Sequence, residues 1–279
     1  MADVAWRRPT APPSVLLDHI FWLHVPKCGG SLTHTIFSYA CPGRKLDVDG
    51  QGTHHPRSTC GGNISSLQAF LTHGNYHVPL PWLNAFRVSQ AVGNVVGMFR
   101  QPSQRLLSAF YHMREKPWCC HVDWGLGAAE SPRRLALGAL RNASDFASAA
   151  GMLGCQTKML AGRHCCDLQP LSRAEITRVS AFVLRGMAFV GLLEEWRMSI
   201  CLFHARFGGP LRVAELSNVR PTHTGRALGG RYDESQLGAV RDSADEQVYA
   251  AATARLWGDV RASQTLVDGC MEATKSKAG

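Results

Sequence analysis

The sequence predicts an α/β protein with a mostly parallel central sheet flanked by helices. In three places an apolar run ends at a turn and is followed by a run with helical spacing. These pairs are 15–25 with 31–40, 88–99 with 103–114, and 181–193 with 194–207. Strands that alternate with helices in this way are typical of parallel sheets, because each helical crossover returns the chain to the same sheet edge.

The other segments follow from their residue types. Residues 1–14 are polar and rich in proline, so we expect a disordered lead-in, and we expect residues 15–279 to form a single domain. Pro26 ends the first apolar run, and Leu32, Ile36 and Phe37 recur at helical spacing after it. The expected loop covers 41–62, a short helical stretch opens at Asn63, and 234–256 is expected to be helical.

The composition favours a globular protein with a polyanionic partner. Hydrophobic residues make up 45% of the 279 residues, and 30 Lys and Arg against 21 Asp and Glu give a net charge of +9. A basic surface attracts nucleotides, acidic glycans, nucleic acid or anionic lipid. Because the basic residues are scattered and never form a long block, nucleic acid is the disfavoured partner.

Two features favour a secretory compartment, and one argues against it. Ten cysteines and the sequons Asn63-Ile64-Ser65 and Asn142-Ala143-Ser144 fit disulfides and attached glycans. The N-terminal residues lack a long apolar segment, and no run approaches the roughly 18 apolar residues of a membrane span. Either the chain is not exported, or its targeting segment is missing from this sequence, and no membrane span is expected in it.

The stretch HVPKCGGSLTHTIF, residues 24–37, has the order of an anion-binding turn. The first turn of a helix leaves backbone N–H groups unpaired, and the helix dipole adds partial positive charge there. Gly29 and Gly30 allow a phosphate to approach the backbone, Ser31 adds a hydroxyl, and Lys27 adds a charge. The alternative is a plain glycine turn with a solvated lysine.

The order of residues excludes one common use of such a turn. The loop of nucleoside triphosphatases is G-x-x-x-x-G-K-[ST], in which the lysine follows the glycines. Here Lys27 precedes them. The lysine therefore lies at the end of the strand rather than on the helix, and a nucleotide kinase-like activity is disfavoured for the same reason.

Two motifs carry a resemblance to a known family. The order P-K-x-G-G-[ST] at 26–31 resembles the 5′-phosphosulfate loop of sulfotransferases that use 3′-phosphoadenosine 5′-phosphosulfate (PAPS). The stretch MFRQPSQRLLSAFYH, residues 98–112, is similar to the 3′-phosphate motif R-x-P-x-x-R-x-x-S-A-[FY]-[YF] of the carbohydrate sulfotransferases. In that family the arginine and the serine hold the 3′-phosphate, which selects Arg100 and Ser108. A guanidinium fork suits a phosphate dianion.

Later blocks extend the resemblance over nearly the whole chain. CQTKMLAG (155–162), FVGLLEEW (189–196) and ADEQVYAAA (244–252) are similar to blocks of the family that contains the heparan sulfate 2-O- and 6-O-sulfotransferases. The resemblance implies a P-loop-like sulfotransferase fold and PAPS as co-substrate, without a metal. It also implies a carbohydrate acceptor and a location in the Golgi lumen. The net positive charge of the chain favours an anionic carbohydrate as that acceptor.

The resemblance also assigns the chemistry. Sulfuryl transfer to a hydroxyl needs a base for the acceptor proton and a cation for the oxygen that leaves with the nucleotide. Lys27 fits the second role, and residues Cys28, Gly29, Gly30, Ser31 and Leu32 would cradle the 5′ end. The family places a histidine between the two phosphate motifs, and the segment THGNYHVP offers His77 and His73. His77 matches the pattern better.

Two residues depart from the family pattern. Cys28 replaces the usual threonine after the lysine, and Gln101 replaces the common aspartate after the strand arginine. The first change removes a hydroxyl that contacts phosphate or sulfate, while the backbone donors remain. These departures leave open an alternative function, a binding module for the nucleotide or for an anionic glycan that has lost turnover.

Cysteines occur next to each other in two clusters, Cys119-Cys120-His121 and His164-Cys165-Cys166. Structural zinc sites usually have C-x₂₋₄-C spacing, because adjacent cysteines seldom point at one ion. Disulfides are therefore the favoured interpretation of these clusters, with free thiols and zinc as the alternatives.

Overall fold

The computed structural model describes residues 4–6, 21–40, 77, 79–80, 95–115, 132–216, 224–225, 228 and 230–275. Within them, strands β2 (Phe21–Leu23), β3 (Val95–Phe99) and β4 (Phe189–Leu192) form a parallel sheet in the order β2-β3-β4. Trp22 pairs with Val96, and Gly97 with Val190. The predicted α/β class with a parallel sheet is confirmed at this level. The predictions for 41–62, for the helix at Asn63 and for 119–121 lie outside the described residues.

A second, two-stranded sheet joins the N-terminal end of the described chain to residues 211–212. Strand β1 (Val4–Trp6) pairs antiparallel with β5 (Leu211–Arg212). Strand β1 lies within the segment 1–14, for which the sequence predicts disorder. The difference has a physical reason, because the Trp6 side chain is only 9% exposed and anchors the strand in the hydrophobic core.

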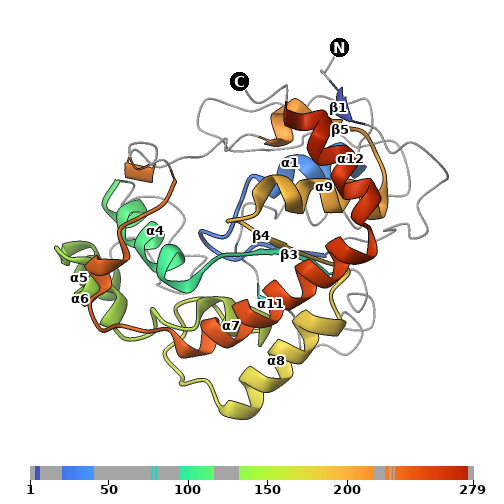
Figure 1. Cartoon of the computed structure of the whole chain (residues 1–279). Helices are drawn as coiled ribbons and strands as arrows, with labels where there is room; N and C mark the ends of the chain where they lie inside the picture. Colours follow the sequence, from blue (N-terminus) through green and yellow to red (C-terminus); the bar gives the residue numbers. More distant parts are fainter. Residues whose placement is uncertain are drawn as a thin grey trace.

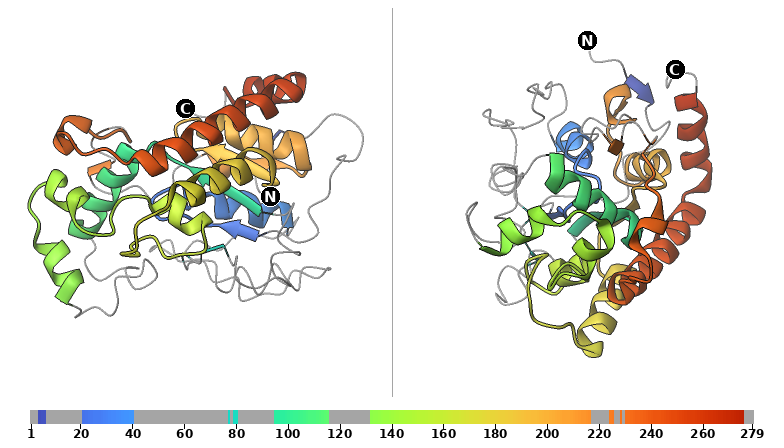
Figure 2. Two further views of the ribbon diagram at one scale, coloured as in Figure 1. Left: turned by 90° about the horizontal axis from the view of Figure 1, so that it is seen from below. Right: turned by 90° about the vertical axis from the view of Figure 1, so that its left-hand side faces the viewer.

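Helices cover both faces of the three-stranded sheet (Figure 1). The α-helices and 3₁₀ helices are α1 (Leu32–Ala40), α4 (Pro102–Glu115), α5 (Pro132–Ala139), α6 (Ala143–Ser148), α7 (Cys155–Leu160), α8 (Arg173–Arg185), α9 (Trp196–Phe207), η2 (Val213–Leu216), η3 (Glu234–Leu237), α11 (Ser243–Ala262) and α12 (Gln264–Lys275). In Figure 1, α1 and α9 lie on one side of the sheet and α8 and α11 on the other. Figure 2 shows α11 and α12 following each other along the outside of the molecule.

The third predicted strand is shorter than the sequence indicated. Of the segment 181–193, the first residues belong to helix α8, and only Phe189–Leu192 form a strand. Ser172 and Glu175 form a capping box that starts the helix, and Val179 and Val183, one turn apart, are fully buried. The apolar residues before Gly186 therefore form the buried face of helix α8, and those after it form strand β4.

The C-terminal helical segment is also divided. Within 234–256 the chain forms η3, then a turn, and then α11, which continues to Ala262. Gly238 has a φ of 54°, and Asp242 accepts a hydrogen bond from the N–H of Asp245 at the start of α11. A left-handed glycine followed by an acidic N-cap ends one helix and starts the next.

Two disulfides link the described elements. Cys155 at the start of α7 pairs with Cys165, and Cys201 in α9 pairs with Cys270 in α12. Cys165 belongs to one of the two predicted cysteine clusters, and its pairing with Cys155 is compatible with the disulfide interpretation, whereas its neighbour Cys166 is a buried thiol. In the described part of the chain, no helix combines the length and the apolar character that crossing a membrane requires.

Candidate anion-binding site

The turn between β2 and α1 is held in a strained backbone conformation. Lys27 has a φ of 67° and Gly29 a φ of 80°. A side chain at Gly29 would start 3.2 Å from the Trp196 ring on α9 and 3.4 Å from Leu193 and Met98. A positive φ at a residue other than glycine is uncommon and is concentrated at functional sites. The strain at Lys27 therefore makes this turn a candidate functional site.

The same turn presents backbone donors. The N–H groups of Leu32 and Thr33 donate to the carbonyls of Gly29 and Gly30, at 3.0 and 3.2 Å. Among the described residues, the N–H groups of Gly29, Gly30 and Ser31 have no protein acceptor. Three adjacent donors at the start of a helix form the concave site that a phosphate or sulfate group prefers. Leu32 belongs instead to the core, with a fully buried side chain.

Arg100 brings the second predicted motif to this turn. It follows β3 directly, and its Nη1 donates to the carbonyl of Lys27 at 3.3 Å. Its guanidinium also lies over the ring of Tyr232, 5.5 Å from the centroid, and burial lowers its pKa. Among the described residues, its buried Nε has no hydrogen-bond partner. A buried guanidinium with an unused donor is suited to an anionic ligand.

Ser108 lies on the same helix that Arg100 introduces. It is in α4, nearly two turns from the first residue, and its side chain is 3% exposed. The parallel sheet explains why the two motifs meet, because β2 and β3 are neighbours and both turns follow the carboxyl ends of these strands. Ligands of open α/β sheets bind at that edge.

The Cys28 side chain points away from the anion-binding donors. Its Sγ lies 3.5 Å from Oε1 of Gln156 on α7, and the side chain is 2% exposed. Burial raises the pKa of this thiol to about 12, so it stays protonated at neutral pH. The sequence placed Cys28 in the anion cradle by its position, and the geometry leaves only its backbone on that side.

His77 lies beside the turn. Its Nδ1 donates to the carbonyl of His24, at 2.8 Å, since a carbonyl only accepts. The two rings lie 4.4 Å apart, and Trp22 stacks on His24. In the neutral ring the proton on Nδ1 makes Nε2 the basic nitrogen, which is the tautomer that a general base needs. His73 lies outside the described residues, so the choice between the two histidines stays a prediction.

Sequence reasoning did not select Gln156 as a site residue. Its side chain contacts both turns. Its Oε1 accepts from the N–H of Arg100 at 3.0 Å and lies 3.5 Å from Sγ of Cys28, and its Nε2 donates to the Arg100 carbonyl at 3.0 Å. The signal for it was present in the block CQTKMLAG, which the family resemblance singled out without giving any residue in it a role.

Gln101 is also accounted for by its contacts. Its N–H donates to Oε1 of Glu194 at 2.9 Å, and its Nε2 donates to Oε2 of Glu234 at 3.3 Å. The side chain of an aspartate here would face the Glu234 carboxylate. The replacement therefore matches the acidic neighbours of this residue.

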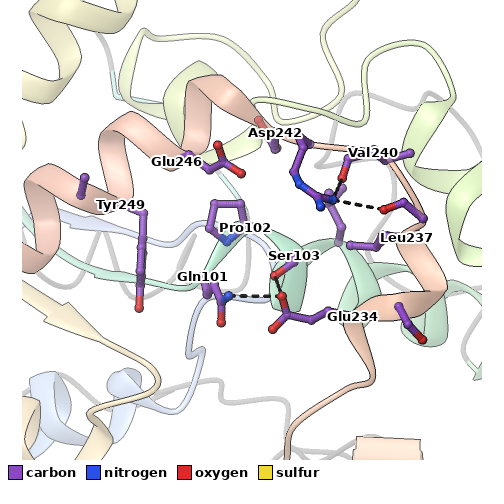
Figure 3. Close-up of a pocket in the computed structure, with 14 residues that line it drawn as sticks. Gln101, Pro102, Ser103, Glu234, Leu237, Val240, Asp242, Glu246 and Tyr249 are labelled. Atoms are coloured by element: carbon purple, nitrogen blue, oxygen red, sulfur yellow. Dashed lines mark hydrogen bonds between the residues drawn. The ribbon is translucent and has the colours of Figure 1, made fainter.

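A pocket of about 590 Å³ is lined by Gln101 and Pro102 of the second turn, but not by residues 27–31, Arg100 or Ser108. It is formed by the start of α4, by η3 and by the start of α11 (Figure 3). The carboxylates of Glu234, Asp242 and Glu246 line it, and Glu234 accepts hydrogen bonds from Ser103 and Gln104. Three carboxylates disfavour a phosphate or sulfate. The turns, with their backbone donors and Arg100, are therefore the better candidate for an anion-binding site.

The reactivity of the two free thiols among the described residues, Cys28 and Cys166, tests whether the Cys28 side chain is buried. Burial raises the pKa of Cys28 to about 12 and of Cys166 to about 11. We expect iodoacetamide to modify both more than about 100-fold more slowly in the native protein than in denaturant at about pH 8, because the thiolate is the nucleophile. Mass spectrometry of the peptides measures each site. Rapid native labelling of Cys28 would contradict its position.

Comparisons of the chain with protein-family models, with curated proteins and with solved structures found no match.

Proposed function

We propose that this protein is a sulfotransferase that transfers the sulfuryl group of PAPS to a hydroxyl of a carbohydrate acceptor, on a P-loop-like sulfotransferase fold. One observation carries the proposal. The buried guanidinium of Arg100 donates to the carbonyl of Lys27, so two motifs that are far apart in the sequence are in direct contact. The nucleotide carries anionic groups at its 5′ and 3′ ends and needs two such motifs side by side.

The residues around this edge have chemically consistent roles. The N–H groups of Gly29, Gly30 and Ser31 bind the 5′ phosphosulfate, and Arg100 with Ser108 binds the 3′-phosphate. Nε2 of His77 takes the proton of the acceptor hydroxyl as its oxygen attacks sulfur. The bond from sulfur to the bridging oxygen breaks, and its electron pair stays on the 5′-phosphate of the product, 3′-phosphoadenosine 5′-phosphate (PAP). Lys27 stabilises that charge.

Further observations support an enzyme in an oxidising compartment. The pairs Cys155–Cys165 and Cys201–Cys270 are disulfides, which persist in secretory compartments, and the sequon residue Asn142 is exposed. Both fit the Golgi lumen, and the net charge of +9 fits an anionic glycan as acceptor. The departure at Cys28, which favoured a binding module without turnover, is accommodated by its hydrogen bond to Gln156.

Binding of PAP tests the proposal directly. We expect calorimetry to show that wild-type protein binds PAP, and that Arg100→Leu binds about 10- to 100-fold more weakly, because a charge-assisted contact to phosphate is lost. Arg173→Leu is the control, since it removes the same charge from an exposed position on α8.

The wild-type protein is then incubated with labelled PAPS and a panel of glycans. Transfer of label to a glycan is the expected result. A wild-type protein that does not bind PAP would overturn the proposal, and binding without transfer to any acceptor would identify the non-catalytic module instead.

A further inference from the structure

The side-chain amide of Gln156 links the two turns that flank the proposed nucleotide site. Its Oε1 accepts from the Arg100 N–H at 3.0 Å and lies 3.5 Å from Sγ of Cys28, while its Nε2 donates to the Arg100 carbonyl at 3.0 Å. One amide thus pairs both backbone groups of Arg100, as a neighbouring strand would. The Gln156 side chain is fully buried, so no water competes for these bonds.

Gln156 is itself fixed by a carboxylate on another helix. Its N–H donates to Oδ2 of Asp245 at 3.0 Å, and the N–H and hydroxyl of Thr157 donate to Oδ1 at 2.9 and 2.8 Å. Asp245 lies on α11, is fully buried and has Nε of Arg105 at 3.6 Å. The disulfide at Cys155 holds the same end of α7. The start of helix α7, which carries the Gln156 side chain, is therefore held in place independently of both turns.

We infer that Gln156 is a positioning residue, which sets the orientation of the Arg100 backbone relative to the turn at Cys28 and so the spacing of the two phosphate-binding motifs. This inference rests on the proposed function. Gln156 has no role in contacting the nucleotide. Its effect should appear in the affinity for PAP, which spans both turns, and much less in the affinity for adenosine 5′-monophosphate, which engages only one.

The variant Gln156→Glu separates positioning from packing, because the new side chain has nearly the same shape. When protonated, the introduced carboxyl donates to the Arg100 carbonyl and accepts from the Arg100 N–H, as the amide does. When ionised, it loses the donor and places charge against a carbonyl oxygen. Burial raises the pKa of a carboxyl, so the two forms interchange within an accessible pH range.

We expect Gln156→Glu to bind PAP within about 3-fold of wild type near pH 5 and at least about 10-fold more weakly near pH 8. Wild type over the same pH range corrects for titration of the PAP phosphates. Gln169→Glu is the matched control at an exposed position and should follow wild type. Adenosine 5′-monophosphate should lose less than about 3-fold in the same variant.

The outcomes separate this inference from the proposed function. If wild type binds PAP and Gln156→Glu shows the wild-type pH profile, the positioning role is wrong and the proposed function stands. An unfolding midpoint that falls with pH while the PAP affinity follows wild type would make Gln156 merely structural, which also overturns the inference. If wild type does not bind PAP, the proposed function fails first and the inference fails with it.

Discussion

Replacing His77 with alanine or asparagine is expected to lower the rate of sulfuryl transfer by about 10²- to 10⁴-fold, the usual contribution of a general base. The asparagine variant is the sharper of the two. Its side-chain N–H₂ keeps a donor for the His24 carbonyl, which the Nδ1 of His77 now contacts at 2.8 Å, and it removes only the basic nitrogen. PAP affinity should therefore change little in His77→Asn.

The measurement is the initial rate of label transfer from PAPS, with PAP affinity determined on the same protein. His164→Ala, at an exposed position, is the control for loss of a histidine. His73→Ala tests the rival base. If His73→Ala loses transfer and His77→Asn keeps it, the two assignments must be exchanged, and if both variants keep it, neither histidine is the base.

The second large effect is on stability, and it concerns Asp245. Its fully buried carboxylate accepts hydrogen bonds from Gln156 and Thr157 and is 3.6 Å from the fully buried Arg105. Asp242 is a second carboxylate beside Arg105, with its Oδ2 3.8 Å from Nη2, and burial, followed by the charge of Asp245, raises the pKa of Asp242 to about 7. We expect Asp245→Ala to reduce the free energy of unfolding by about 3–5 kcal/mol, because it removes the nearer of the two carboxylates beside buried Arg105 and leaves the buried N–H groups of Gln156 and Thr157 without their acceptor.

Urea denaturation of the purified variants measures this loss. Asp259→Ala is the matched control on the same helix, since Asp259 pairs with Arg206 and Arg255 at the surface and is 20% exposed. Surface pairs contribute less than about 1 kcal/mol. Equal losses in the two variants would show that the buried network contributes no more than a surface pair.

The local elements followed from the sequence where local patterns decide structure. Leu32 and Ile36 recur one turn apart and are both fully buried in α1, and the apolar run before Arg100 forms the fully buried β3. Segment 181–193 was different, because an apolar run of that length suits a buried strand or a helix face equally. The capping box at Ser172 and Glu175 favoured the helix, and the strand was confined to Phe189–Leu192.

The sequence by itself determined the α/β class and the positions of Lys27, Gly29, Gly30 and Arg100, because these lie where strands end and helices begin, and it placed Ser108 on the helix that follows Arg100. Only the tertiary structure decided how the two turns are joined. The Arg100 contact with Lys27 and the Gln156 amide connect residues that are distant in the chain, and neither leaves a periodic pattern. Hydrogen bonds across a sheet edge depend on how strands and helices pack, which local sequence does not encode.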